Sequence, residues 1–427
     1  MTSAATQASS FKSIASILMC VGFLVAGNGL FQTVFPLRAD AEGFSVVLIG
    51  LLGTAYFAGF AMGCFWCPRI IRSSGHIQAF AGVAAITTAL SLAFPILPDP
   101  YVWAILRFLH GIAFAALFVV IESWLNDRSD NDNRGRVLSA YIIVSNMLTI
   151  AGQLMINLYA VEDDRPFILV AMLICLAIVP LTLVRVATPT PITTAKIDIR
   201  SLYHLSPVGL IGCFLVGAAE GAFWSLGPVF AQQRDFDVSD VAFLMAAFVL
   251  GGTLSQWPLG WLSDRVDRRY IIAAIAFGGV GTGIVIGYID LTGDWAIFAL
   301  AVAHGALMVP LYAMCLSHAN DYAPNSKMVE VSSGLLLAYS TGAALGPLAA
   351  SLFMGPERSG GLFAFIALVL LVLAVFTSIR IAKRNRDYAE RAEFVPVPKT
   401  TAVVFSLEED DELPADTDTA ETSPNLR

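Results

Sequence analysis

The sequence predicts an all-α integral membrane protein with twelve transmembrane helices in two six-helix bundles. Of its 427 residues, 57% are hydrophobic and only 14% are charged, whereas roughly a quarter of the residues in soluble domains are charged. The apolar residues form runs of the length that one bilayer crossing requires, about 20 residues. Twelve such runs and their short loops account for nearly the whole chain, so little remains for a separate soluble domain.

Turn-rich or charged segments separate most of these apolar runs from one another. The shortest separation is at Pro98–Pro100, where only three residues intervene between two runs. We expect helices at Ile14–Leu37, Ser45–Cys67, Ile77–Leu97, Tyr101–Trp124, Val137–Tyr159, Pro166–Val186, Pro207–Ala231, Ser239–Leu262, Tyr270–Ile289, Trp295–Ser317, Met328–Phe353 and Gly360–Ile381.

The basic residues predict the orientation, because Lys and Arg are retained in cytoplasmic loops. With the N-terminus inside, only Arg38, Arg165, Arg234 and Arg358 fall in outer loops, and most of the 25 Lys and Arg residues fall in inner ones. Both termini are therefore expected in the cytoplasm, in a multi-pass protein of the cell inner membrane. The net charge of −8 comes largely from acidic outer loops and the last twenty residues, so it does not indicate a nucleic-acid partner.

The chain also repeats itself at a spacing of about half its length. A shift of 192 residues places Gly59 on Gly251, and a shift of 194 places Gly152 on Gly346. Two similar halves around a midplane site are typical of carriers that move one bundle against the other. We divide the chain into a disordered N-terminal tail (1–10), a six-helix bundle (11–186), a cytoplasmic linker (187–206), a second six-helix bundle (207–382) and a disordered acidic cytoplasmic tail (383–427).

A charged turn between two apolar runs carries the pattern G-x-x-x-D-R-x-x-R-R, from Gly260 to Arg269. This pattern resembles the loop signature of the major facilitator superfamily, G-x-x-x-D-R-x-G-R-R, with Asp267 in place of the second glycine. Other segments are similar to the YcaD-type branch of that superfamily: NRGR at 133–136, QWPLG at 256–260 and LLLAYSTGAALGP at 335–347. The resemblance covers the chain from Phe11 to about Arg386.

The resemblance implies a conformational latch in this loop, formed by Gly260, Asp264, Arg265, Arg268 and Arg269. An aspartate in such a latch holds a neighbouring helix N-terminus and an arginine. The first-half copy is degraded, because Pro68 occupies the glycine position and Arg72 the aspartate position. A fifth-helix G-x-x-x-G-P motif, which the resemblance associates with antiporters, is absent around Gly152, although a similar string occurs at 342–347.

Charged residues inside the membrane indicate function, because each costs several kcal/mol unless it faces a partner or a wet cavity. Arg107 matches the fourth-helix arginine that the resemblance associates with proton coupling or substrate contact; the alternative is an arginine that extends to the outer surface. Glu122 lies within a turn of the cytoplasmic end of its helix. We expect it to pair with Arg134 or Arg136 in a cytoplasmic gate; a direct role in substrate binding is the alternative.

The resemblance implies that helices one, four, seven and ten line a central cavity. Counted from the cytoplasmic ends of these helices, Asn28, His110, Glu220 and His304 lie 13 or 14 residues in, at a common depth of roughly 20 Å. Because burial favours the neutral form of a carboxyl group, Glu220 in such a layer could load and release a proton. Depth does not fix the direction of a side chain, so the alternative for the histidines and Asn28 is hydrogen bonding to neighbouring helices.

The sequence therefore predicts a secondary active transporter that moves a small organic solute by alternating access, coupled to protons through Glu220 and Arg107. Export and uptake remain open. The alternative is a non-transporting sensor or scaffold that signals through the acidic tail. We expect no enzymatic activity, cofactor, metal site or obligate protein partner; the expected partners are the solute, protons and the bilayer. No phosphate-cradling G-x-x-x-x-G-K-[ST] run supports ATP-driven transport.

Overall fold

The computed structural model describes residues 2–127, 134–182, 198–289, 294–324, 327–355, 360–383 and 399. All regular secondary structure in these ranges is helical: α1 Thr2–Ala41, α2 Val46–Ser74, α3 His76–Ile96, α4 Pro100–Asp127, α5 Arg134–Leu154, η1 Met155–Leu158, α6 Arg165–Leu176, α7 Ile178–Thr182, α8 Ile199–Leu205, α9 Pro207–Gln232, α10 Val238–Ser263, α11 Arg268–Tyr288, α12 Asp294–Met308, α13 Leu311–Asn320, α14 Met328–Ser351 and α15 Gly361–Lys383. Twelve segments within them are long and apolar enough to cross a membrane.

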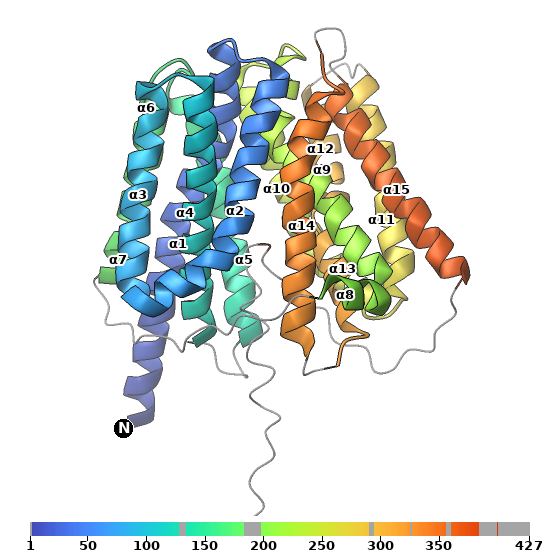
Figure 1. Cartoon of the computed structure of the whole chain (residues 1–427), viewed down its shortest axis with the longest axis horizontal. Coiled ribbons are helices and arrows are strands. Elements are labelled where there is room, and N and C mark those ends of the chain that lie inside the picture. Colours follow the sequence, from blue (N-terminus) through green and yellow to red (C-terminus); the bar gives the residue numbers. More distant parts are fainter. Residues whose placement is uncertain are drawn as a thin grey trace, which may run out of the picture.

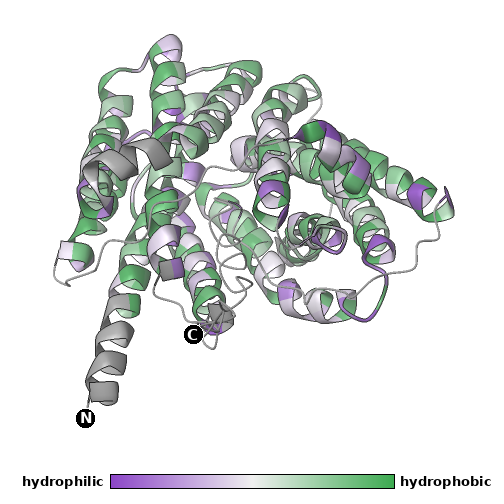
Figure 2. Ribbon diagram, turned by 60° about the horizontal axis from the view of Figure 1, so that its bottom comes forward, coloured by the Kyte–Doolittle hydropathy of each residue, from purple (hydrophilic) through white to green (hydrophobic). Residues whose placement is uncertain are grey.

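The helices form two groups that lie side by side, α1 to α7 in one and α8 to α15 in the other (Figure 1). Apolar residues run along most of each helix, and many of the hydrophilic residues lie near helix ends (Figure 2). Large apolar side chains also face outward, among them Leu254 at 63% exposure and Ile105 at 62%. Such a periphery suits contact with lipid rather than water, so the all-α integral membrane fold is confirmed.

Close glycine contacts hold the helices of each group together and repeat between the groups. A Cβ on Gly59 would lie 2.0 Å from the carbonyl oxygen of Phe108, and one on Gly251 would lie 1.9 Å from that of Val302. The pairs Gly152 with Ala26 and Gly346 with Ala218 repeat the pattern at 2.0 and 2.1 Å. The repeat seen in the sequence is thus a repeat of helix packing, because only glycine allows two backbones to approach so closely.

Two of the expected helices are broken, each at a proline. The sixth span divides into α6 and α7 near Pro180, and the tenth divides into α12 and α13 at Pro310. Proline lacks a backbone N–H and its ring clashes with the carbonyl four residues earlier, so the helix cannot continue unchanged. The expectation of continuous helices at Pro166–Val186 and Trp295–Ser317 was therefore wrong. Proline does not break every helix here, since α1, α3, α9, α10 and α14 each continue through one.

The ends of the chain are described only in part. Helix α1 begins at Thr2, so residues 2–10, expected as a tail, are helical in the structure. The short helix α8 lies within the expected linker, whose residues 187–197 fall outside the described ranges. The same holds for the acidic tail after Lys383 except for Lys399.

We call the face where α1 begins and α15 ends the terminal face, and the face where α2 and α10 begin the opposite face.

Candidate functional site

A cavity of about 290 Å³ lies between the two helix groups. Its walls come from α1, α2, α4 and α5 in the first half and from α9, α10 and α14 in the second, with Val309 from the break between α12 and α13. Spans one, four, seven and ten were expected to line the cavity. Spans two, five, eight and eleven line it as well. The polar and aromatic side chains of the wall are Asn28, Gln32, Tyr56, Phe57, Phe60, Phe118, Tyr141, Ser145, Asn146, Thr149, Glu220, Trp224, Gln256, Tyr339, Ser340 and Lys399.

Glu220 lies in this wall at the middle of α9 and is 1% exposed. Glycines on either side of it, Gly217 and Gly221, let α9 approach the backbone of α14, where added Cβ atoms would lie 2.1 Å from the Tyr339 oxygen and 2.4 Å from the Ala343 oxygen. This close packing brings the Tyr339 hydroxyl to Glu220, and it donates a hydrogen bond of 2.7 Å to Oε2.

Lys399 also reaches Glu220. Its Nζ lies 2.5 Å from Oε1 and 2.7 Å from Oε2 of the carboxylate, and its side chain is 25% exposed. Among the described residues that line the cavity, Glu220 and Lys399 carry the formal charges. The carboxylate is therefore compensated inside the cavity by an ammonium group and a hydroxyl, which together offset the cost of burying it.

Of the residues expected in one polar layer with Glu220, only Asn28 also lines the cavity. Arg107 lies directly behind the wall: its guanidinium carbon is 4.2 Å from the ring centroid of Phe35 and 4.5 Å from that of Tyr56. Its Nη2 donates to Gln32 at 3.5 Å. Since Tyr56 and Gln32 both line the cavity, Arg107 touches the wall through them.

The two histidines lie within the helix bundles, away from the cavity wall. His110 is fully buried and packs against Phe31 at a ring distance of 4.5 Å and Phe114 at 4.8 Å. His304 is also fully buried, and its Nδ1 lies 2.9 Å from the Thr282 hydroxyl. The histidines were expected at the same depth as Glu220. They point from their helices in other directions, so they do not line the cavity with it.

Glu122, which we expected in a cytoplasmic gate, contacts a tyrosine that was not predicted from the sequence. Glu122 is 2% exposed and accepts a hydrogen bond of 3.1 Å from the hydroxyl of Tyr141, which lines the cavity. Arg136 is exposed, and the side chain of Arg134 falls outside the described residues. Tyr141 therefore connects Glu122 to the cavity, and the pairing of Glu122 with either arginine stays a prediction.

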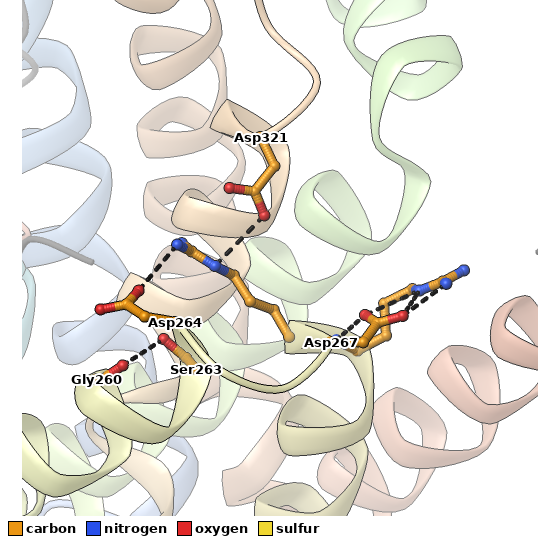
Figure 3. A network of polar contacts seen from close by, with 7 residues as sticks. Gly260, Ser263, Asp264, Asp267 and Asp321 are labelled. Carbon is orange, nitrogen blue, oxygen red and sulfur yellow. Dashed lines mark hydrogen bonds and ion pairs between the residues drawn. The ribbon is translucent and has the colours of Figure 1, made fainter. Parts of the chain in front are cut away.

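The charged turn after α10 forms a network with the end of α13 (Figure 3). Nη2 of Arg268 lies 3.2 Å from Asp264 Oδ1, and its Nε lies 3.3 Å from Oδ2 of Asp321. The side chains of Arg268 and Asp321 are 2% and 1% exposed. The turn is thereby fixed to α13 by a buried ion pair, and Asp321 is a member of the network that sequence reasoning missed.

The remaining signature residues stabilise the turn locally. Asp267 caps the N-terminus of α11 by accepting a hydrogen bond of 2.9 Å from the backbone N–H of Arg269. It also pairs with the Arg269 side chain at 2.7 Å. Arg265 donates to the Trp261 carbonyl at 3.0 Å, and the Gly260 carbonyl accepts from Ser263 at 2.8 Å. An aspartate at the N-cap adds a side-chain acceptor for a helix N–H, so Asp267 is suited to the position where the resemblance has glycine.

The two halves touch near the opposite face. A Cβ on Gly50 would lie 2.7 Å from both the Pro347 oxygen and the Ser351 side chain. The Ser239 hydroxyl donates to Asn157 Oδ1 at 2.9 Å, which joins the start of α10 to η1. Nearer the middle, Asn146 donates to Thr253 at 2.9 Å. These contacts close the opposite-face side of the cavity.

A family model described as the Major Facilitator Superfamily matches residues 17–237 and 209–409. The chain belongs to the Major Facilitator Superfamily. It is 26% identical over 359 residues to an uncharacterized MFS-type transporter of Enterobacter sp. (strain 638) and, equally, to one named YcaD of Salmonella heidelberg (strain SL476). In both cases the match covers 83% of this chain and 93% of the relative. The YcaD-type resemblance is confirmed.

Solved structures of other transporters share the fold. A mutant form of the nucleoside transporter NupG superposes with a TM-score of 0.73 at 12% identity, covering 86% of this chain and 99% of that one. A bacterial homolog of the human lysosomal transporter Spinster, in an inward-facing and unoccupied conformation, gives 0.67 at 14% identity, covering 87% and 95%. At this identity the likeness shows the fold alone. The family match and the named relatives support a membrane transporter.

Three residues in or next to the site were not singled out from the sequence: Tyr141, Tyr339 and Lys399. Tyr339 lies inside the segment LLLAYSTGAALGP that carried the family resemblance, so a tyrosine in an otherwise apolar helix was an available signal. Lys399 had none, because 179 residues separate it from Glu220 along the chain.

Proposed function

We propose that this transporter is a secondary carrier that moves a small organic solute by alternating access and exchanges protons at Glu220. The observation that carries the proposal is the position of Glu220, buried in the wall of a cavity to which both halves contribute. A buried carboxylate is stable when it is protonated or paired, so a change in access or in its partners changes its proton occupancy.

The contacts between the halves support alternating access. They gather near the opposite face, at Gly50 with Pro347 and at Asn157 with Ser239, and the cavity lies between them and the terminal face. If the terminal face is cytoplasmic, as the basic residues indicate, this arrangement is an inward-facing state. Transport then requires these contacts to open while the halves close on the cytoplasmic side.

Proton coupling is tested by measuring proton flux into liposomes that hold the purified protein while a panel of small organic solutes is added. We expect a solute-driven flux in the wild type that falls to background in Glu220→Gln, because the amide keeps the shape and cannot exchange a proton. Glu330→Gln is the matched control, since Glu330 lies at the start of α14 and does not line the cavity. An equal flux in Glu220→Gln and wild type would place the proton site elsewhere.

Alternating access is tested by joining the halves on the opposite face. The Asn157 and Ser239 side chains approach to 2.9 Å, so Asn157→Cys with Ser239→Cys should form a disulfide that holds the contact closed. We expect oxidation to stop transport and a reductant to restore it, while each single cysteine variant transports under both conditions. Transport that continues with the cross-link formed would contradict the mechanism. A protein that moves no solute under any condition would favour the sensor function.

A further inference from the structure

The occupant of the cavity indicates which chemical group the cavity accepts. The Lys399 ammonium lies within hydrogen-bond distance of both Glu220 carboxylate oxygens, at 2.5 and 2.7 Å. Tyr339 donates to the same carboxylate at 2.7 Å, so the hydroxyl fixes one oxygen while both remain available to a cation. The result is a pocket for a primary ammonium group, which a lysine of the chain itself fills.

The surroundings of this pocket favour a cation with an apolar body. The Lys399 Nζ is 6.0 Å from the ring centroid of Tyr339, within the range in which an aromatic face attracts a positive charge. Other aromatic rings, Tyr56, Phe60, Phe118 and Trp224, line the same cavity. The described wall therefore offers one carboxylate and several ring faces, a combination that suits a hydrophobic amine and opposes an anion.

The charge balance of the pocket also favours a ligand with an ammonium group. Removing the ammonium from Glu220 would leave a carboxylate at 1% exposure with the Tyr339 hydroxyl as its remaining partner among the described residues, and breaking a buried pair in this way is costly. A ligand that brings its own ammonium replaces Lys399 without that cost. A neutral or anionic ligand does not, unless Glu220 takes up a proton.

We propose that the Glu220 and Tyr339 site binds the ammonium group of a small hydrophobic amine, and that Lys399 occupies the same position when no amine is bound. This proposal rests on the proposed function, because it identifies the substrate class of the same cavity. Lys399 acts as a built-in competitor: the apparent affinity for an amine is reduced by the fraction of molecules in which Lys399 fills the site.

The experiment measures binding of 4-phenylbutylamine to the full-length protein in lipid nanodiscs by isothermal titration calorimetry. The matched probe 4-phenylbutanol has the same apolar body with a hydroxyl in place of the ammonium. We expect Lys399→Gln to bind the amine at least about tenfold more tightly than wild type, since the competitor is gone, and Glu220→Gln to lose binding. Lys383→Gln, at the exposed end of α15, is the control and should bind like wild type.

Equal amine affinities in Lys399→Gln and wild type would overturn the competitor role, and amine binding that survives in Glu220→Gln would overturn the site. Tighter binding of the alcohol than of the amine would overturn the ligand class. Tyr339→Phe serves as a second variant that separates binding from folding. We expect weaker amine binding at an unchanged melting temperature.

This binding result is independent of the proton-flux result. Amine binding at Glu220 without any solute-driven proton flux would keep the inference and contradict the proton coupling. A Glu220-dependent flux driven by a neutral or anionic solute, in a protein that does not bind the amine, would keep the coupling and contradict the inference.

Discussion

Replacing Gly251 with alanine should destabilise the second bundle. Gly251 lies on α10, where an added Cβ would lie 1.9 Å from the carbonyl oxygen of Val302 on α12. The contact is reciprocal, because a Cβ on Gly305 of α12 would lie 2.0 Å from the carbonyl oxygen of Phe248. Both obstructing atoms belong to backbone, so no side chain can rotate away and the two helices must move apart.

The geometry gives the size of the effect. A carbon and a carbonyl oxygen in close contact lie about 3.3–3.6 Å apart, so α10 and α12 must separate locally by about 1.4 Å. Overpacking of this kind costs about 1–3 kcal/mol, and the separation also weakens the dispersion contacts around the pair. Gly281→Ala is the matched control: Gly281 lies on the exposed side of α11, and nothing lies within 4 Å of its added Cβ.

The assay follows thermal unfolding in detergent with a thiol-reactive fluorophore. Cys20, Cys213 and Cys315 are fully buried, so they react as the protein unfolds, whereas the exposed Cys175 contributes to the starting signal. We expect Gly251→Ala to unfold at a clearly lower temperature than wild type and Gly281→Ala to remain near wild type. Equal unfolding temperatures for both variants would refute the close packing of α10 on α12.

Two further variants test the turn network and the site. Asp321→Asn removes one of two carboxylate partners of the buried Arg268, which keeps Asp264, so it should cost about 1.5–3 kcal/mol of stability. Glu42→Gln, which removes the more exposed pair with Arg38, should cost less than about 1 kcal/mol. Similar melting temperatures for these two variants would contradict the burial of the network. Tyr339→Phe removes the hydroxyl bonded to Glu220 and should slow solute-driven proton flux by about tenfold; an unchanged rate would show that the hydroxyl is dispensable.

The number of membrane spans could be predicted because it depends on local composition. Each span is a run of apolar residues, and a bilayer requires every buried backbone group to bond within its own helix. The repeat could also be predicted from the sequence. Gly59 and Gly251 make equivalent close contacts, so both positions require glycine and the spacing appears in the sequence. Proline alone did not predict the breaks near Pro180 and Pro310, because Pro95, Pro228 and Pro347 lie inside continuous helices.

The candidate site was predicted only in part. Glu220 was identified because a carboxyl group inside an apolar helix is unfavourable without a partner, and its depth followed from the rise of the helix. The same count placed His110 and His304 at that depth, but the structure turns both into their own bundles. Depth depends on the number of residues, whereas direction depends on how helices rotate to bury their faces.

The sequence by itself determined the fold class, the span count, the repeat and the presence of a charge within the membrane, since these follow from the composition and order of nearby residues. Only the tertiary structure decided which polar groups meet. The contacts of Glu220 with Tyr339 and Lys399, and of Arg268 with Asp321, join residues far apart in the chain. Such contacts are set by the packing of whole helices against each other, because a side chain's partners depend on the rotation and separation of two elements and on no local pattern in either one.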